Sequence, residues 1–172
     1  MNRRLTAAAL VALALCGTFS LSGCSIANLI STVAGGDKEP PRDDDTGEIT
    51  EEGDLDVFSI AVGDCLGSTP EGEVESITAV PCSEAHDGEV FYDFSLPDGE
   101  FPGDDAMQTA VYDGCDPAFE TFVGLPYNES TLDYTYYAPT EESWNQLDDR
   151  LVSCVITDPN GPVTGSLEGA GR

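Results

Sequence analysis

The clearest alternation of apolar and polar residues runs from Gly88 to Leu96, where Val90, Tyr92 and Phe94 would share one face. A period of two residues is typical of a β-strand that buries one of its faces. Leu151 to Thr157 is almost continuously apolar, so this strand is expected to be covered on both faces. Shorter runs of apolar and β-branched residues predict further strands at residues 57–62, 74–80 and 132–136, with a short edge piece at 165–167.

A helical period replaces the strand pattern after Asp104. An apolar stripe at helical spacing extends from Met107 to Val123, and Gly124 follows as a stop signal. Pro117 lies inside this stretch and is expected to kink the helix or to restart it. Thr140 is placed to cap a second, short helix. The pattern predicts an α+β fold, a mainly antiparallel sheet with one long helix and one short helix packed on it.

The first 23 residues have the composition of an export signal. Arg3 and Arg4 precede an apolar run that ends at Phe19, and small residues follow as far as Gly23. A charged start, a short apolar core and a small-residue exit are typical of a signal peptide. The apolar run is shorter than the ~20 residues that a retained transmembrane helix needs. We therefore expect residues 1–23 to be a cleaved signal peptide.

The segment Leu21-Ser22-Gly23-Cys24 resembles the lipobox of bacterial lipoproteins. In that family the signal is cut before the cysteine, and the cysteine thiol then carries a lipid. The resemblance implies that Cys24 becomes the acylated N-terminus and attaches the chain to the membrane. It also implies a location on the outer face of the cytoplasmic membrane.

Residues 24–53 are expected to form an acidic, flexible tether. They contain few aromatic residues and a run of three aspartates at 43–45, so they have little surface to bury. The folded domain is predicted to span residues 54–169, and a chain of 172 residues has room for one such domain.

The charge of the chain narrows the choice of partners. The formal net charge is −27, and removing the signal takes away two arginines and no acid, which makes it −29. A protein this acidic is not expected to bind nucleic acid, whose phosphates require Lys and Arg. It is also not expected to lie flat on an anionic membrane surface. The acidity favours solubility and cationic partners or counter-ions, and a simple solvated surface is the less specific interpretation.

Six cysteines point to an oxidising compartment. Cys16 lies in the signal and Cys24 at the anchor, which leaves an even set of four cysteines in the domain. Such a set in an exported domain predicts two disulfides, for which three connectivities are possible. Their order along the chain favours two local pairs, Cys65 with Cys82 and Cys115 with Cys154.

No group of residues has the spacing of a known catalytic, cofactor or metal site. Cys65 lies in a G-x-C-x-G segment, but a turn follows where a nucleophile elbow needs a helix. Cys82, His86 and Asp87 are too few for a zinc site. His86, the only histidine, is the one candidate functional side chain, and a hydrogen-bonding role in its loop is the alternative. No spacing singles out a pair of catalytic acids among 33 carboxylates.

The domain resembles the septum-formation family of high-GC Gram-positive bacteria. The likeness spans about residues 54–169 and implies a link to division-septum formation at the cell envelope. The family supplies no catalytic residues to carry over. The matching pieces are Asp56-Val57-Phe58, Val62-Gly63-Asp64-Cys65, residues 80–90, Cys115, residues 139–144, Cys154 and Thr164-Gly165-Ser166-Leu167.

The sequence leads to two hypotheses of different classes. The first is a non-enzymatic, lipid-anchored module that binds an unidentified envelope protein or wall component at the septum. The alternative is an envelope hydrolase that uses acidic residues, together with His86. A deep pocket with two converging acids and a shifted pKa would favour the hydrolase. A shallow face that carries aromatic side chains would favour the binding module.

Overall fold

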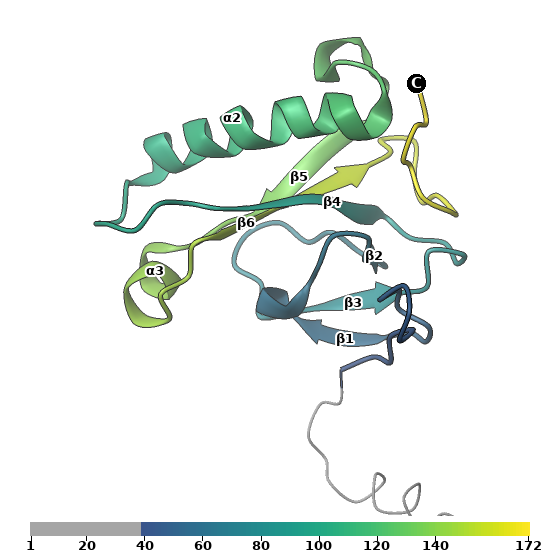
Figure 1. Ribbon diagram of the computed structural model, residues 1–172, viewed down its shortest axis with the longest axis horizontal. Helices are drawn as coiled ribbons and strands as arrows, with labels where there is room; N and C mark the ends of the chain where they lie inside the picture. Colours follow the sequence, from purple (N-terminus) through teal and green to yellow (C-terminus); the bar gives the residue numbers. More distant parts are fainter. Residues whose placement is uncertain (1–38) are drawn as a thin grey trace, which may run out of the picture. The chain divides into compact units, whose positions relative to one another are not determined.

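The computed structural model describes residues 39–172, and the predicted signal peptide, lipidated Cys24 and first part of the tether lie outside the described residues. A curled sheet of six strands, all paired antiparallel, runs in the order β1-β3-β2-β4-β6-β5 (Figure 1). One long and one short α-helix accompany it, so the predicted α+β fold is confirmed. The strands are β1 (Gly53–Asp56), β2 (Cys65–Leu66), β3 (Ser76–Val80), β4 (Gly88–Ser95), β5 (Asp133–Tyr137) and β6 (Leu151–Thr157), and the helices are α2 (Asp104–Val123) and α3 (Glu141–Gln146), with 3-10 turns η1 (Val57–Ser59) and η2 (Tyr127–Glu129).

The curled sheet buries apolar side chains on both of its faces. Helix α2 lies across the face formed by β4, β6 and β5 (Figure 1), and Val152, Cys154 and Ile156 of β6 point into the cluster beneath it. Val155, on the opposite face of β6, belongs to a second cluster that includes Leu55 and Ile77. All five central residues of β6 are buried, which confirms the expectation that both faces of this strand are covered.

The alternation predicted along β4 is broken by a register shift between Val90 and Tyr92. Val90 belongs to the second cluster and Phe91 to the cluster under α2, whereas Tyr92 is 39% exposed. A β-bulge places one extra residue in the strand, so side chains after it change faces. The predicted shared face of Val90 and Tyr92 was therefore wrong.

Helix α2 is continuous from Asp104 to Val123, with Pro117 inside it. The predicted restart at Pro117 was therefore wrong. Cys115 and Phe119, two fully buried side chains, lie on either side of the proline and hold both halves of the helix to the sheet. Gly124 ends the helix in the left-handed conformation that glycine adopts without strain, as predicted.

The strand predicted at residues 57–62 is a 3-10 turn instead. The Asp56 carboxylate accepts a hydrogen bond from the Phe58 N–H, which caps η1 and ends β1. The preceding residues form β1 because Leu55, with 0% exposure, pairs with Ile77 in the second cluster. The first strand therefore begins four residues earlier than predicted, at Gly53 instead of Val57.

Residues 40–53, which precede the predicted domain start at Asp54, are packed against the rest of the domain. The Asp43 carboxylate accepts N–H groups two and three residues ahead, which forms a turn that brings Arg42 opposite Ile49. Ile49 is 5% exposed and packs in the second cluster, and Arg42 pairs with Asp64. Residues 40–53 therefore belong to the folded domain and not to the tether, because a turn in the acidic run inserts an apolar residue into the core.

The last eight residues form a turned segment, the C-terminal strap, which packs against the end of α2, and the predicted edge strand at 165–167 does not form. Leu167 is buried, and its N–H donates to the Glu89 carboxylate at 2.7 Å. The N–H groups of Gly169 and Gly171 donate to the carbonyls of Phe122 and Val123. The strap therefore satisfies two carbonyls at the C-terminal end of α2 that the helix cannot pair itself.

Candidate functional site

The four domain cysteines are consumed in structural bonds. Cys65 is bonded to Cys82 and Cys115 to Cys154, which confirms the favoured pairing. The second bond fastens α2 to β6 in the centre of the core. With Cys65 buried and oxidised, the G-x-C-x-G segment holds no thiol that could act as a nucleophile.

His86 lies inside the protein, with 1% of its surface exposed. Its ring Nδ1 donates to the Glu84 carbonyl at 2.9 Å, and its backbone exchanges two hydrogen bonds with Val163. The other ring nitrogen, Nε2, is buried with no hydrogen-bond partner in residues 39–172. His86 therefore holds the loop after the first disulfide against the segment around Val163, through hydrogen bonds of the kind named as the alternative to a functional role.

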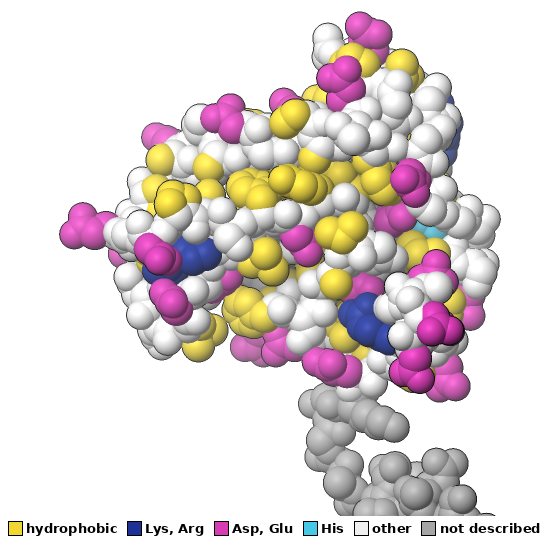
Figure 2. All heavy atoms as spheres, in the orientation of Figure 1, with side chains coloured by type: hydrophobic (Ala, Val, Ile, Leu, Met, Phe, Trp, Pro, Cys, Tyr) yellow, Lys and Arg dark blue, Asp and Glu magenta, His cyan; other side chains and the backbone are white. Residues whose placement is uncertain are grey.

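Every lysine or arginine in residues 39–172 is already paired with an acid. Arg42 binds Asp64, Arg172 binds Asp158, and Arg150 lies within 4 Å of two aspartates. The other carboxylates have no basic partner in this part of the chain, and Figure 2 shows acidic side chains all around the outline of the domain. The outward field is therefore negative, which favours the approach of cationic partners.

One candidate recess lies where the N-terminal turn meets the loop of residues 59–64, and it measures about 300 Å³. Its floor is Asp64, which is 1% exposed and receives the Arg42 guanidinium at 2.8 Å and the Ala61 N–H at 2.8 Å. Asp64 is thus fully engaged by an internal cation. The ion pair that lines this recess therefore attaches the N-terminal turn around Arg42 to the rest of the domain.

Asp93 of β4 is a partly buried acid whose carboxyl group interacts with the charge of Asp64. Burial raises the pKa of the Asp93 carboxyl, and the charge of Asp64 raises it further, while the Ser153 hydroxyl and the Val62 N–H oppose both effects. Its Oδ1 is buried with no hydrogen-bond partner in residues 39–172. Because Asp64 is bound to Arg42, the two acids do not form a pair that is free to act on a substrate.

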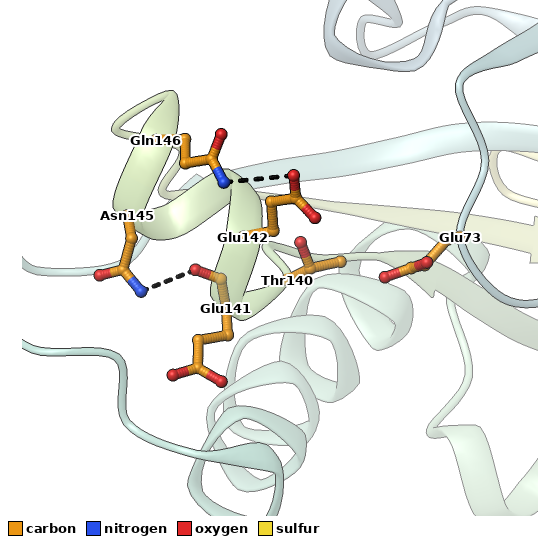
Figure 3. Close-up of a pocket in the computed structure, with 6 residues that line it drawn as sticks. All are labelled: Glu73, Thr140, Glu141, Glu142, Asn145 and Gln146. Atoms are coloured by element: carbon orange, nitrogen blue, oxygen red, sulfur yellow. Dashed lines mark hydrogen bonds between the residues drawn. The ribbon is translucent and has the colours of Figure 1, made fainter.

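A second recess, of about 460 Å³, lies at the start of α3 and is open to solvent. Thr140 and Ser143 cap each other's backbone and begin the helix directly after β5, as the sequence predicts for Thr140. The lining carries three carboxylates and two amides and no basic side chain. Figure 3 shows the Glu73 carboxylate facing Thr140 across the recess, and the lining residues are Glu73, Thr140, Glu141, Glu142, Asn145 and Gln146.

Tyrosines of β5 and η2 form an aromatic cluster beside the end of α2. The Tyr134 hydroxyl donates to Asp116 at 2.6 Å, and the Tyr127 hydroxyl donates to Asp133 at 2.7 Å. The hydrogen bond to Asp133 raises the pKa of Tyr127 to about 12, and burial followed by the bond to Asp116 raises the pKa of Tyr134. These hydroxyls stay protonated at neutral pH and act as hydrogen-bond donors.

A second apolar feature is visible on the face shown in Figure 2, where hydrophobic side chains gather in a band between α2 and β4. Tyr92 stacks on Phe94 there, with ring centroids 5.9 Å apart. The Phe94 ring in turn lies against Gly114 of α2. The band is a shallow surface that carries aromatic side chains, the kind of face expected of a binding module.

The described residues contain no membrane-crossing helix, since none from residue 39 onward has the required length and apolarity. The same part of the chain contains no group of three or more His, Cys, Asp or Glu residues arranged to hold a metal ion.

Sequence reasoning missed the ion pair between Arg42 and Asp64 and the position of β5 at the edge of the sheet. Arg42 is the only Lys or Arg between residues 39 and 149, a stretch rich in acids, and this contrast was a signal for a specific ion pair. Nothing in the local sequence marks β5 as an edge strand, because its place depends on the order of all six strands.

Comparison with protein families matches residues 34–154 to the family described as Septum formation. The match covers more than half of the chain and includes the Arg42–Asp64 ion pair and all four disulfide cysteines. No curated protein and no solved structure matches the chain at a significant level.

Proposed function

Since this chain belongs to the septum formation family, we propose that it is a lipid-anchored, non-enzymatic binding module on the outer face of the cytoplasmic membrane. Its membership fits a role in septum formation. The module would hold an envelope protein or wall component near the division site, with the lipid on Cys24 as its attachment to the membrane.

The observation that carries this proposal is the character of the described surface. Arg42, Arg150 and Arg172 are neutralised within the domain, and several aromatic side chains are exposed on an otherwise acidic surface, namely Phe58, Tyr92, Tyr112 and Tyr127. Such a surface suits recognition of a cationic partner. The two disulfides support an extracytoplasmic location, because such bonds persist in oxidising compartments.

The anchor is tested by replacing Cys24 with alanine and separating membranes from medium. The variant is expected to leave the membrane fraction. Cys16→Ala is the matched control, because Cys16 lies within the predicted signal and should not affect anchoring. Retention of the Cys24 variant in the membrane would overturn the lipid anchor.

Binding at the septum is tested in living cells by imaging a fluorescent fusion of the full chain and by crosslinking. We expect enrichment at division sites together with one defined crosslinked partner. A uniform distribution with no crosslinked partner would contradict the septal role.

Asp93 supports a second candidate function, an envelope hydrolase, because a carboxyl with a raised pKa is a common feature of catalytic acids. The two functions are separated by incubating the purified full chain with isolated cell wall. Release of soluble fragments that is lost in Asp93→Asn would favour the hydrolase. Binding without release, retained in that variant, would favour the binding module.

A further inference from the structure

Strand β5 is the last strand of the sheet and pairs with β6 alone. The direction of its backbone groups follows from the neighbouring strands. The Leu96 N–H donates to the Arg150 carbonyl, so the backbone groups of Arg150 point toward β4. Along β6, the backbone N–H and C=O groups of successive residues therefore point alternately toward β5 and toward β4. This alternation directs Thr135 of β5 toward β6 and leaves Tyr134 and Tyr136 with their N–H and C=O groups on the outer edge.

One contact confirms this assignment. The Tyr134 N–H donates to the carboxylate of Asp133 at 2.8 Å and so points away from β6. Among residues 39–172, no hydrogen bond from outside the sheet reaches the N–H or C=O of Tyr136. The outer edge therefore presents a donor and an acceptor at Tyr136 and an acceptor at Tyr134.

This edge lacks most of the usual protection. Natural edge strands are commonly shortened, bulged, or interrupted by lysine or proline. The five residues of β5, Asp133 to Tyr137, include neither lysine nor proline, and their pairing with β6 has no register shift. Tyrosine and threonine are strong strand formers. Asp133 is the one protecting charge, and it lies at the first position.

Carboxylates lie on one face of this edge and at both of its ends. Asp116 of α2 accepts the Tyr134 hydroxyl on one face, and Asp133 lies at the start of the strand. The acidic recess with Glu73 and Glu142 begins at Thr140, three residues beyond the strand. Pairing two copies of this edge would bring like charges together, whereas a strand that carries lysine or arginine would meet opposite charges.

We propose that the free edge of β5 binds an extended, lysine- or arginine-bearing segment of a partner protein, which adds a seventh strand to the sheet. Hydrogen bonds to Tyr134 and Tyr136 would hold its backbone, and its basic side chains would face the carboxylates around the edge. This inference rests on the proposed function and names the chemical class of its partner.

The test uses the full chain, purified in detergent, and three labelled ten-residue peptides. One alternates lysine with valine, one alternates lysine with proline, and one alternates glutamate with valine. The lysine–proline peptide has the same charge but cannot form a strand. We expect the lysine–valine peptide to bind at least about tenfold more tightly than the other two, measured by fluorescence anisotropy. Its binding should also slow hydrogen exchange at the Tyr136 amide.

Tyr136→Pro and Tyr136→Ala form a matched pair of variants. Both remove the ring, but only the proline removes the outward N–H, which makes no bond to β6. We expect Tyr136→Pro to bind the lysine–valine peptide at least about fivefold more weakly than Tyr136→Ala, the loss of about one hydrogen bond. If the proline variant does not fold, peptide selectivity and amide exchange in the unmodified chain still decide the question.

Equal binding of the two lysine peptides would show that charge alone acts, and would overturn strand addition. Equal affinity of the two variants, or unchanged exchange at Tyr136, would overturn it as well. A dimer in sedimentation that only Tyr136→Pro abolishes would assign the edge to a second copy instead. If the protein localises to the septum but crosslinks to its partner through Asp56 of β1, the strand at the other edge of the sheet, this inference is overturned and the proposed function stays intact.

Discussion

Replacing Gly114 with alanine should destabilise the domain, although alanine is the better helix former. Gly114 lies in the middle of α2, where the helix passes over the ring of Phe94. A Cβ atom at this position would lie 2.5 Å from two carbons of that ring and 3.1 Å from a third. Carbon atoms in contact prefer about 3.5–4.0 Å, so the ring must move by about 1 Å.

Two opposing contributions determine the size of the effect. Alanine in place of glycine favours a helix by about 1 kcal/mol. Overpacking costs about 1–3 kcal/mol, because the Phe94 ring is stacked on Tyr92 and packed against the cluster under α2. We therefore expect Gly114→Ala to lower the free energy of unfolding by about 1 kcal/mol.

A double-mutant cycle separates the two contributions. In a Phe94→Ala background the obstacle is gone, and Gly114→Ala should then stabilise the domain by about 1 kcal/mol. The coupling between the two positions is about 2 kcal/mol, within the range for residues in direct contact. Urea unfolding of the four proteins, followed by tryptophan fluorescence, measures this coupling.

The sign of the change in the Phe94→Ala background is the decisive result. If Gly114→Ala stabilises both backgrounds by the same amount, the helix does not approach β4 as closely as described. If it destabilises both equally, the strain arises from some contact other than the Phe94 ring.

Three further predictions concern other parts of the fold. Gly88→Ala should cost about 1–3 kcal/mol of stability, because its Cβ would lie 2.6 Å from a Thr69 methyl and 2.7 Å from a Val155 methyl. Gly67→Ala, with 3.5 Å to its nearest atom, should cost under about 1 kcal/mol in the same urea assay. Replacing both Cys115 and Cys154 with alanine should cost about 4 kcal/mol, against about 3 kcal/mol for the other disulfide, because it closes a 39-residue instead of a 17-residue span; equal losses would contradict this reasoning. Because the pKa of Asp93 is raised in the folded state, its protonated form stabilises the fold at low pH. This stability is lost as the pH rises through the folded-state pKa. Asp93→Asn should therefore raise the melting temperature at pH 7 but not at pH 3.

The candidate surfaces were only partly predictable from the sequence. The recess at α3 begins at Thr140, whose capping role follows from a local pattern of four residues. The Arg42–Asp64 pair joins positions 22 residues apart across a turn, and no local pattern sets that distance. Tyr134 and Tyr136 lie in the strand predicted at residues 132–136, but the direction of their backbone groups depends on which strand lies beside them.

The sequence by itself determined those features that depend on neighbouring residues or on composition. The end of α2 at Gly124, the cap at Thr140, the two local disulfides and the two-sided burial of β6 all follow from short patterns, because capping, chain connectivity and apolar runs act over a few residues. Only the tertiary structure decided the bulge in β4, the inclusion of residues 40–53 in the folded domain, and the free edge of β5. Each of these arises where segments far apart in the chain compete for the same core or the same strand, and that competition is resolved only when the whole sheet has formed.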